Sequence, residues 1–271
     1  MAPHRNYGLR QSGISLPSLD YCAVHFERAV LMLAKLLKTR QNVDLYAVLK
    51  WAGVGVPRKY RRAVAPLIWA ASRNPHSNRY HHQWHNMSVM ISAALLGRQA
   101  GLGRRQMTVL VMTALVHDLD HRGRNMSRVP FGEERYSAMI AGRRLYGRSG
   151  HGQAWRELQS RLEATFFDKN TTPAIPHDDE VTQILLDADV LASCMLPRAD
   201  ALELTRGVMH EHGTSGKAEQ ALQGFIKTLA ERGFAHAVTS DYAAEMTTRK
   251  AAVFIDPASA ATLGFRGGAD A

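Results

Sequence analysis

Apolar residues recur at helical spacing along most of the chain, and no segment alternates between apolar and polar positions for long enough to predict a strand. The strongest apolar run, residues 107–116, has no clean polar face, which predicts a helix buried on nearly all sides. Further helices are expected between the Gly, Pro and Asn breaks, over 20–38, 43–51, 57–72, 80–100, 133–146, 154–167, 181–196, 198–211, 217–232 and 236–252. The pattern therefore predicts an all-α fold.

The chain divides into four expected parts. Residues 1–75 form an N-terminal helical extension that starts with an irregular stretch over 1–18. In this extension we expect Asp20 to cap the first helix and Val24 to belong to its apolar stripe. Residues 76–215 form the core, 216–255 form helices that pack on the core, and 256–271 form a disordered tail.

The composition limits which binding partners and which cellular compartment are expected. The 271 residues carry a formal net charge of +10, which favours anionic partners such as nucleic acid, acidic lipid or phosphorylated small molecules. The basic residues are scattered, and no zinc-finger spacing or RNA-binding motif is present, which argues against nucleic acid. No apolar stretch is long enough to cross a bilayer, and no signal peptide precedes the first helix. With only Cys22 and Cys194, the sequence favours a reducing cytoplasm.

Three short segments carry candidate chemistry. His117 and Asp118 end the strongest apolar run, where burying them side by side is costly unless a partner such as a divalent metal pairs with them. His81 and His85 are four residues apart on one expected helix and would project from the same face. Asp189 lies in an apolar helical context. Each segment alone is more often structural, as a cap, a surface pair or a salt bridge; their joint occurrence in this order favours a metal site.

The order His, His-Asp, Asp resembles the HD superfamily of metal-dependent phosphohydrolases, and within it the class I cyclic-nucleotide phosphodiesterases. Residues 80–89 are similar to the Tyr-His-Asn-x-x-His-x-x-x-Val element of those enzymes at all but one fixed position, and residues 117–123 match His-Asp-x-x-His-x-Gly in full. The resemblance implies a compact HD-domain helical bundle with helical extensions at both ends. It also implies hydrolysis of 3′,5′-cyclic nucleotides to nucleoside 5′-monophosphates, an activity of signal transduction.

The same resemblance implies a role for each motif residue. The ligands of a tighter, zinc-like metal would be His85, His117, Asp118 and Asp189. Asp118 would bridge to a second, more hydrated ion, so that two divalent ions drawn from Zn, Mn, Mg and Fe would activate a hydroxide. His121 would orient the metal-bound water, and His81 would be the general acid. Asp189 is preferred to Asp187 because Ala188-Asp189 is similar to the Ala-Asp-x-Leu segment of the superfamily.

The sequence departs from this family in the elements that bind the substrate. The phosphodiesterases recognise a purine through a glutamine three residues before a phenylalanine, whereas Gln223 is two residues before Phe225 and Gln220 is five before it. One residue of slip rotates a helical side chain by about 100°, so we do not transfer the purine-binding role. Phe166 replaces the aspartate of an Ala-Thr-Asp-Met step, and residues 133–138 resemble the Glu-Arg-x-Ser-Ala segment of more generic HD phosphohydrolases.

Two other functions therefore remain as alternatives to the phosphodiesterase. One is a nucleotidase or other phosphomonoesterase with the same metal site; the other is a non-catalytic regulatory or nucleic-acid-binding helical protein, suggested by the positive charge. The expected partner is a phosphorylated small molecule, in first place a cyclic nucleotide, with no membrane and with homo-oligomerisation left open. His210 and His212 are expected to be surface histidines rather than ligands.

Overall fold

The computed structural model describes residues 9–11, 14–25, 44–56, 61–72, 78–123, 130–147, 152–166, 179–196 and 198–239. Within these ranges the chain is almost entirely helical, which confirms the all-α prediction. The helices are α1 (Leu19–Val24), α3 (Leu45–Trp51), α4 (Arg61–Ala71), α5 (Gln83–Gln99), α6 (Arg104–Val116), α7 (Gly132–Tyr146), α8 (Gln153–Glu163), α9 (Glu180–Met195), α10 (Arg198–Glu211) and α11 (Ala218–Arg232).

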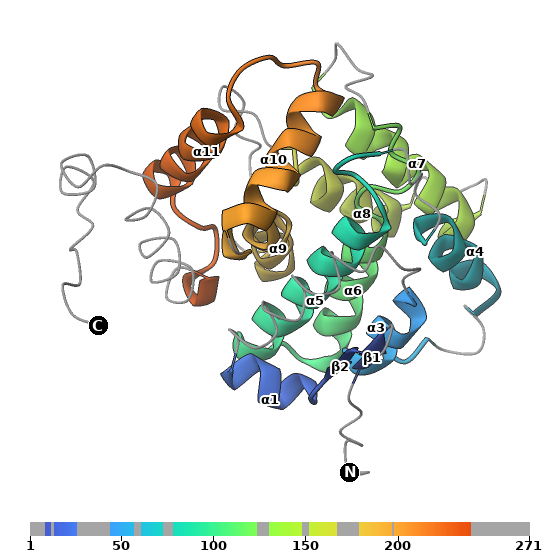
Figure 1. The fold of residues 1–271 in the computed structure, drawn as a ribbon. Helices are drawn as coiled ribbons and strands as arrows, with labels where there is room; N and C mark the ends of the chain where they lie inside the picture. Colours follow the sequence, from blue (N-terminus) through green and yellow to red (C-terminus); the bar gives the residue numbers. More distant parts are fainter. Residues whose placement is uncertain are drawn as a thin grey trace.

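Helix α5 is the centre of the bundle. It packs against α9 and α6 along much of its length and also contacts α1 and α3. Helices α10 and α11 lie on one side of the molecule and α7 and α8 on the other (Figure 1). Residues 83–97 of α5 are all buried. By contrast, Val109 and Met112 of α6 stay partly exposed, so the helix that is buried on all sides is α5 rather than the predicted 107–116 run.

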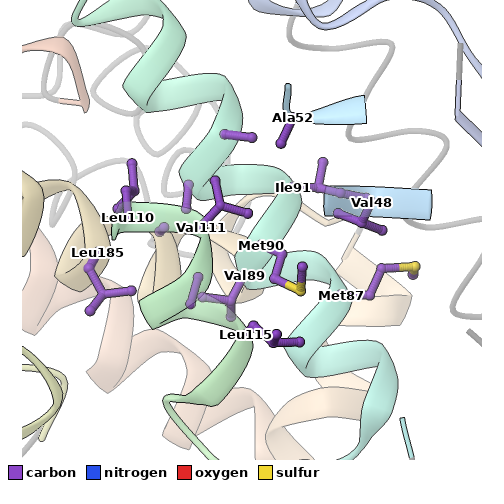
Figure 2. Packing of buried hydrophobic residues seen from close by; sticks show 14 of the residues in the cluster. Val48, Ala52, Met87, Val89, Met90, Ile91, Leu110, Val111, Leu115 and Leu185 are labelled. Carbon is purple, nitrogen blue, oxygen red and sulfur yellow. The ribbon is translucent and has the colours of Figure 1, made fainter. Parts of the chain in front are cut away.

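The hydrophobic core forms where α5 meets its neighbours. Met90 and Ile91 of α5 lie in one cluster with Val48 of α3, Val111 of α6 and Leu185 of α9 (Figure 2). These five side chains are almost fully buried, and each buried aliphatic side chain of this size contributes about 1.5–3 kcal/mol to folding. The core therefore fixes the relative positions of α5, α6 and α9, the three helices that carry the predicted metal ligands.

The N-terminal segment differs from the prediction. Residues 9–11 and 14–16, expected to be irregular, form an antiparallel pair, β1 (Leu9–Gln11) and β2 (Ile14–Leu16). Strands of three residues are too short for an alternating pattern to be recognised in the sequence.

The first helix also begins and ends differently. Its N-cap is Ser18, whose hydroxyl accepts a hydrogen bond from the Tyr21 N–H, while Asp20 lies in the first turn and pairs with Arg98. Val24 is 71% exposed instead of buried in an apolar stripe, and α1 ends there. The rest of this predicted helix and most of the predicted helix 236–252 lie outside the described residues. None of the helices that the structure describes is long and apolar enough to span a membrane.

Candidate metal centre

Four side chains from three helices meet at one point beside the core. His85 comes from α5, His117 and Asp118 follow the end of α6, and Asp189 comes from α9. Nε2 of His85 lies 3.1 Å from Nε2 of His117, 3.1 Å from Oδ2 of Asp118 and 3.2 Å from Oδ1 of Asp189. Nε2 of His117 lies 3.0 Å and 3.5 Å from the same two carboxylate oxygens. The structure thus brings together all four residues proposed as ligands.

The spacing and the chemistry of these donors fit a divalent ion. Ligands bound about 2.0–2.2 Å from one ion lie roughly 3–3.6 Å from one another in tetrahedral or octahedral geometry, and the five contacts given above fall in this range. The donor atoms of His85, His117 and Asp118 all lie within 4.8 Å of one another, whereas Asp189 meets the two imidazoles and is not part of that group. Nδ1 of His117 lies 2.8 Å from the carbonyl oxygen of Ala114. Because a carbonyl can only accept, Nδ1 donates, and in the neutral ring Nε2 keeps the lone pair that a metal needs. Two imidazoles with two carboxylates suit Zn, Mn or Fe.

The electrostatics of the centre also favour a cation. Burial raises the pKa of Asp189, but hydrogen bonds with His117 and His85 outweigh it and hold this pKa at about 2. Burial likewise opposes ionisation of Asp118, yet the His117 imidazole keeps the pKa of this carboxyl well below its usual range. Two carboxylates that stay ionised inside the protein must be compensated by positive charge. Either protonated His85 and His117, whose pKa values burial lowers but these carboxylates raise overall, or a bound cation supplies that charge.

Asp187, the alternative considered for the last ligand, lies elsewhere. Its two carboxylate oxygens accept hydrogen bonds from the backbone N–H groups of Ala235 and His236, at 2.8 Å and 2.9 Å. Asp187 therefore anchors the segment that follows α11 onto α9, and it has no contact with His85 or His117 among the interactions of the described residues.

His81 lies before α5 rather than on it. The N-cap of α5 is His82, whose Nδ1 accepts a hydrogen bond from the His85 N–H, so the prediction that His81 and His85 share one helix is wrong. The short polar stretch before the first apolar turn allows the chain to cap the helix with an imidazole. The ring centroids of His81 and His85 are nevertheless only 5.7 Å apart.

Glu211, at the end of α10, holds His81 in place, and no sequence motif indicated it. Its Oε2 lies 2.5 Å from Nδ1 of His81, and its Oε1 accepts a hydrogen bond from the Tyr80 N–H at 2.6 Å. Burial raises the pKa of Glu211, but the His81 ring and the Tyr80 N–H outweigh it and lower this pKa to about 2. Glu211 is therefore a carboxylate at neutral pH, and the ring nitrogen of His81 that remains for a substrate is Nε2.

His121 stacks on His81, with the ring centroids 3.7 Å apart. Burial and the neighbouring His81 lower the pKa of His121 to about 4, so this ring is neutral at neutral pH. Its Nδ1 accepts a hydrogen bond from the Gly123 N–H at 3.1 Å, which leaves the proton on Nε2. His121 is thus a hydrogen-bond donor toward the cavity.

Asn78 ties the two histidine segments together. Its Nδ2 donates to the carbonyl oxygens of both His81 and His121, at 2.6 Å and 2.8 Å. Gly123 allows this approach because its φ is +66° and a Cβ there would lie on the Asn78 side chain. The glycine of the His-Asp-x-x-His-x-Gly motif therefore has a steric reason in this chain.

His81, His121 and Glu211 form a second cluster whose donor atoms are close enough to hold a metal ion. The two rings lie nearly parallel, with an interplanar angle of 27°, so their in-plane lone pairs do not converge on one point. Nδ1 of His121 is also occupied by the Gly123 N–H. The cluster is better suited to hydrogen bonding and proton transfer than to a second ion.

A cavity of about 380 Å³ opens beside both clusters. Its polar side includes His81, Asp118, His121 and Asp189, and the side formed by α10 and α11 is mainly apolar. Glu134 of α7 also lines the cavity, where burial followed by the carboxylates of Asp118 and Asp189 raises its pKa to about 7. His212 is exposed, as expected for a surface residue, and it also lines this cavity.

The seating of α10 against the His81 segment depends on Gly207. A Cβ at Gly207 would lie 2.5 Å from the carbonyl oxygen of Arg79, a backbone atom that has little freedom to move. We expect Gly207→Ala to lower the free energy of unfolding by about 1–3 kcal/mol through overpacking. A Cβ at Gly224 on α11 would contact nothing within 4 Å, so Gly224→Ala should instead stabilise by about 1 kcal/mol through helix propensity. Urea unfolding of both variants measures the difference; equal effects would contradict it.

Comparisons with known proteins show the fold. Neither the protein-family models nor the curated proteins that were searched contain a match to this chain. Among solved structures, the chain is similar to LmjPDEB1, a cyclic-nucleotide phosphodiesterase determined in complex with IBMX. The TM-score is 0.54 and the sequence identity 14%, over 90% of this chain and 91% of that chain. The two proteins share an all-helical fold over nearly their full lengths.

Proposed function

We propose that this protein is a metal-dependent phosphodiesterase of the HD type that hydrolyses 3′,5′-cyclic nucleotides to nucleoside 5′-monophosphates. The observation that carries the proposal is that His85, His117, Asp118 and Asp189 meet beside a cavity that is lined by Asp118, Asp189 and His81, the histidine paired with Glu211. Two carboxylates and two imidazoles that meet this closely in the protein interior are an arrangement that a divalent ion would hold. The similarity in fold to a phosphodiesterase is consistent with this proposal.

The proposed centre would be held by His85, His117, Asp118 and Asp189, with Asp118 also available to a second ion. Divalent ions bound there would supply a water nucleophile at neutral pH and positive charge for the phosphoryl oxygens. His121, a neutral ring with its proton on Nε2, would hold and orient a water molecule in the cavity.

Hydrolysis of a cyclic diester adds a water oxygen to phosphorus and breaks the bond from phosphorus to the 3′ oxygen. That oxygen leaves as an alkoxide unless it receives a proton. As an imidazolium whose Nδ1–H is donated to Glu211, His81 would give this proton from Nε2 and be left neutral, while Glu211 fixes the orientation of the ring. The pair therefore supplies the general acid that an alkoxide leaving group needs.

The charge of the cavity favours a diester over a monoester. None of the described residues that line it is a lysine or an arginine, whereas Asp118, Asp189, Glu133 and Glu134 contribute carboxyl groups. A phosphodiester carries one negative charge, but a phosphomonoester carries nearly two at neutral pH. The second charge would meet no cationic side chain here, so a nucleotidase is the less favoured function.

The test is a phosphoester panel with the purified protein. After incubation with Zn²⁺, Mn²⁺ or Mg²⁺, we expect hydrolysis of cyclic AMP or cyclic GMP to the 5′-monophosphate, together with bound metal by elemental analysis. Hydrolysis of monophosphates in preference to cyclic diesters would replace the proposal by the phosphomonoesterase. Absence of bound metal, together with salt-sensitive nucleic-acid binding, would favour the non-catalytic function instead.

A further inference from the structure

The apolar side of the cavity is formed by two helices that pack on each other, α10 and α11. From α10 it receives Leu204, Val208 and Met209, and from α11 it receives Leu222 and Phe225. The neighbouring polar groups on this side are the hydroxyls of Thr205 and Thr214 and the imidazole of His212. The part of a substrate that lies away from the phosphate therefore meets mainly hydrocarbon surface and one aromatic ring.

On α11, Leu222 and Phe225 face the cavity together. They are three residues apart and so lie on the same face of the helix. Leu222 is 2% exposed and lines the cavity, whereas Gln223, one residue further along, does not line it. Gln220, the other glutamine of this helix, is exposed. The rotation of about 100° per residue thus turns both side-chain amides of α11 away from the cavity.

Amides matter here because they distinguish nucleobases. A glutamine can donate to and accept from the edge of a base, so that a wrong base leaves buried polar groups unpaired and is strongly rejected. Among the described residues that line the cavity, none is an asparagine or a glutamine. Apolar contacts follow size and shape, and they discriminate only weakly between ligands of similar outline.

We propose that the apolar lining from α10 and α11, which includes Leu222 and Phe225, determines the substrate specificity of this site. It makes the protein a phosphodiesterase that selects an apolar or flat organic group by shape without distinguishing adenine from guanine. This inference rests on the proposed function and adds the substrate class to it. The class comprises diesters with one negative charge and a planar group that fits against Phe225 and Leu222, including diesters that contain no nucleobase. The aliphatic lining and the absence of cationic side chains among the described lining residues exclude polyphosphates from the class.

The test compares wild type with Leu222→Gln, which introduces an amide at the position that faces the cavity. The substrates are cyclic AMP, cyclic GMP and bis(4-nitrophenyl) phosphate, and the readout is kcat/KM. For wild type we expect values for the two cyclic nucleotides within about 5-fold of each other and clear activity on the aryl diester. Leu222→Gln should change the ratio of the two nucleotides by about 10-fold or more and lower activity on the aryl diester.

Two further variants serve as controls. Gln223→Leu removes an amide that does not line the cavity and should leave the nucleotide ratio unchanged. Leu222→Met conserves the apolar surface and should also leave the ratio unchanged, which separates specificity from general damage to α11. An unchanged ratio in Leu222→Gln, or a preference of wild type for one base by more than about 100-fold, would overturn the inference.

Binding of cyclic AMP and cyclic GMP by calorimetry distinguishes failure of this inference from failure of the proposed function, since binding can be measured where no hydrolysis occurs. One outcome is that wild type binds the two nucleotides equally, Leu222→Gln binds them unequally, and neither protein hydrolyses them. This outcome would support the inference and refute the proposed phosphodiesterase activity. Hydrolysis with an unchanged nucleotide ratio in Leu222→Gln would refute the inference alone. A wild type that binds neither nucleotide would overturn the inference.

Discussion

Asp189→Asn is expected to lose bound metal and to lower kcat/KM for the cyclic nucleotide by about 10³-fold or more, the equivalent of about 4 kcal/mol. An asparagine has the same shape, but it replaces one carboxylate oxygen by an NH₂ group that donates and cannot bind a cation. The imidazoles of His85 and His117 would then face a neutral amide at 3.2–3.5 Å. Elemental analysis of the purified variant and steady-state kinetics measure the two losses.

The matched control is Asp187→Asn, two residues earlier on α9. Asp187 accepts hydrogen bonds from two backbone N–H groups, and an amide would turn one of its oxygens into a donor that faces a donor. We expect a loss of about 1–3 kcal/mol in the free energy of unfolding, with metal content unchanged. Asp189→Asn should therefore lose metal, whereas Asp187→Asn should lose stability and keep its metal. If Asp189→Asn kept its metal, or if Asp187→Asn lost it, the assignment of ligands would be wrong.

The fold could be predicted from the sequence where helices are long and bounded by clear breaks. The predicted helix 198–211 agrees with α10, and the predicted helix 217–232 begins one residue before α11. The strands β1 and β2 were not predicted, because they have only three residues each. Helix α1 was predicted, but with other ends. The most buried helix was misidentified as well. Serines, a glutamine and an asparagine interrupt the apolar sequence of α5, and only tertiary packing buries them.

Within the candidate site, the side chains that could be predicted stand in recognisable sequence patterns. The positions of those that were missed depend on how the helices pack. His85, His117 and Asp118 stand in two short motifs, and Asp189 stands in an apolar helix, where a charged residue is conspicuous. Glu211 is 130 residues from His81 and lies in a segment with no recognisable spacing. The orientation of Leu222 toward the cavity depends on how α11 packs on α10, which composition and periodicity do not give.

His81→Ala is expected to lower kcat for the cyclic nucleotide by about 10²–10⁴-fold, the usual contribution of a positioned general acid. Metal content should stay at the wild-type level, because His81 is not among the four converging donors. The same variant should lose less than about 10-fold with bis(4-nitrophenyl) phosphate, since 4-nitrophenolate leaves as a stable anion and needs no proton. The ratio of the two losses therefore reports protonation of the leaving oxygen separately from damage to the fold.

Glu211→Gln tests the residue that orients His81, the proposed general acid. A glutamine can still accept the Tyr80 N–H, but its NH₂ group would face Nδ1 of His81, so the ring would lose the acceptor that orients it. We expect an intermediate loss, about 10–100-fold in kcat with the cyclic nucleotide and again little with the aryl diester. His210→Ala, which removes an exposed histidine one residue before Glu211, should change neither rate. Equal losses with both substrates in His81→Ala would mean that His81 positions the substrate or supports the centre rather than donating the proton.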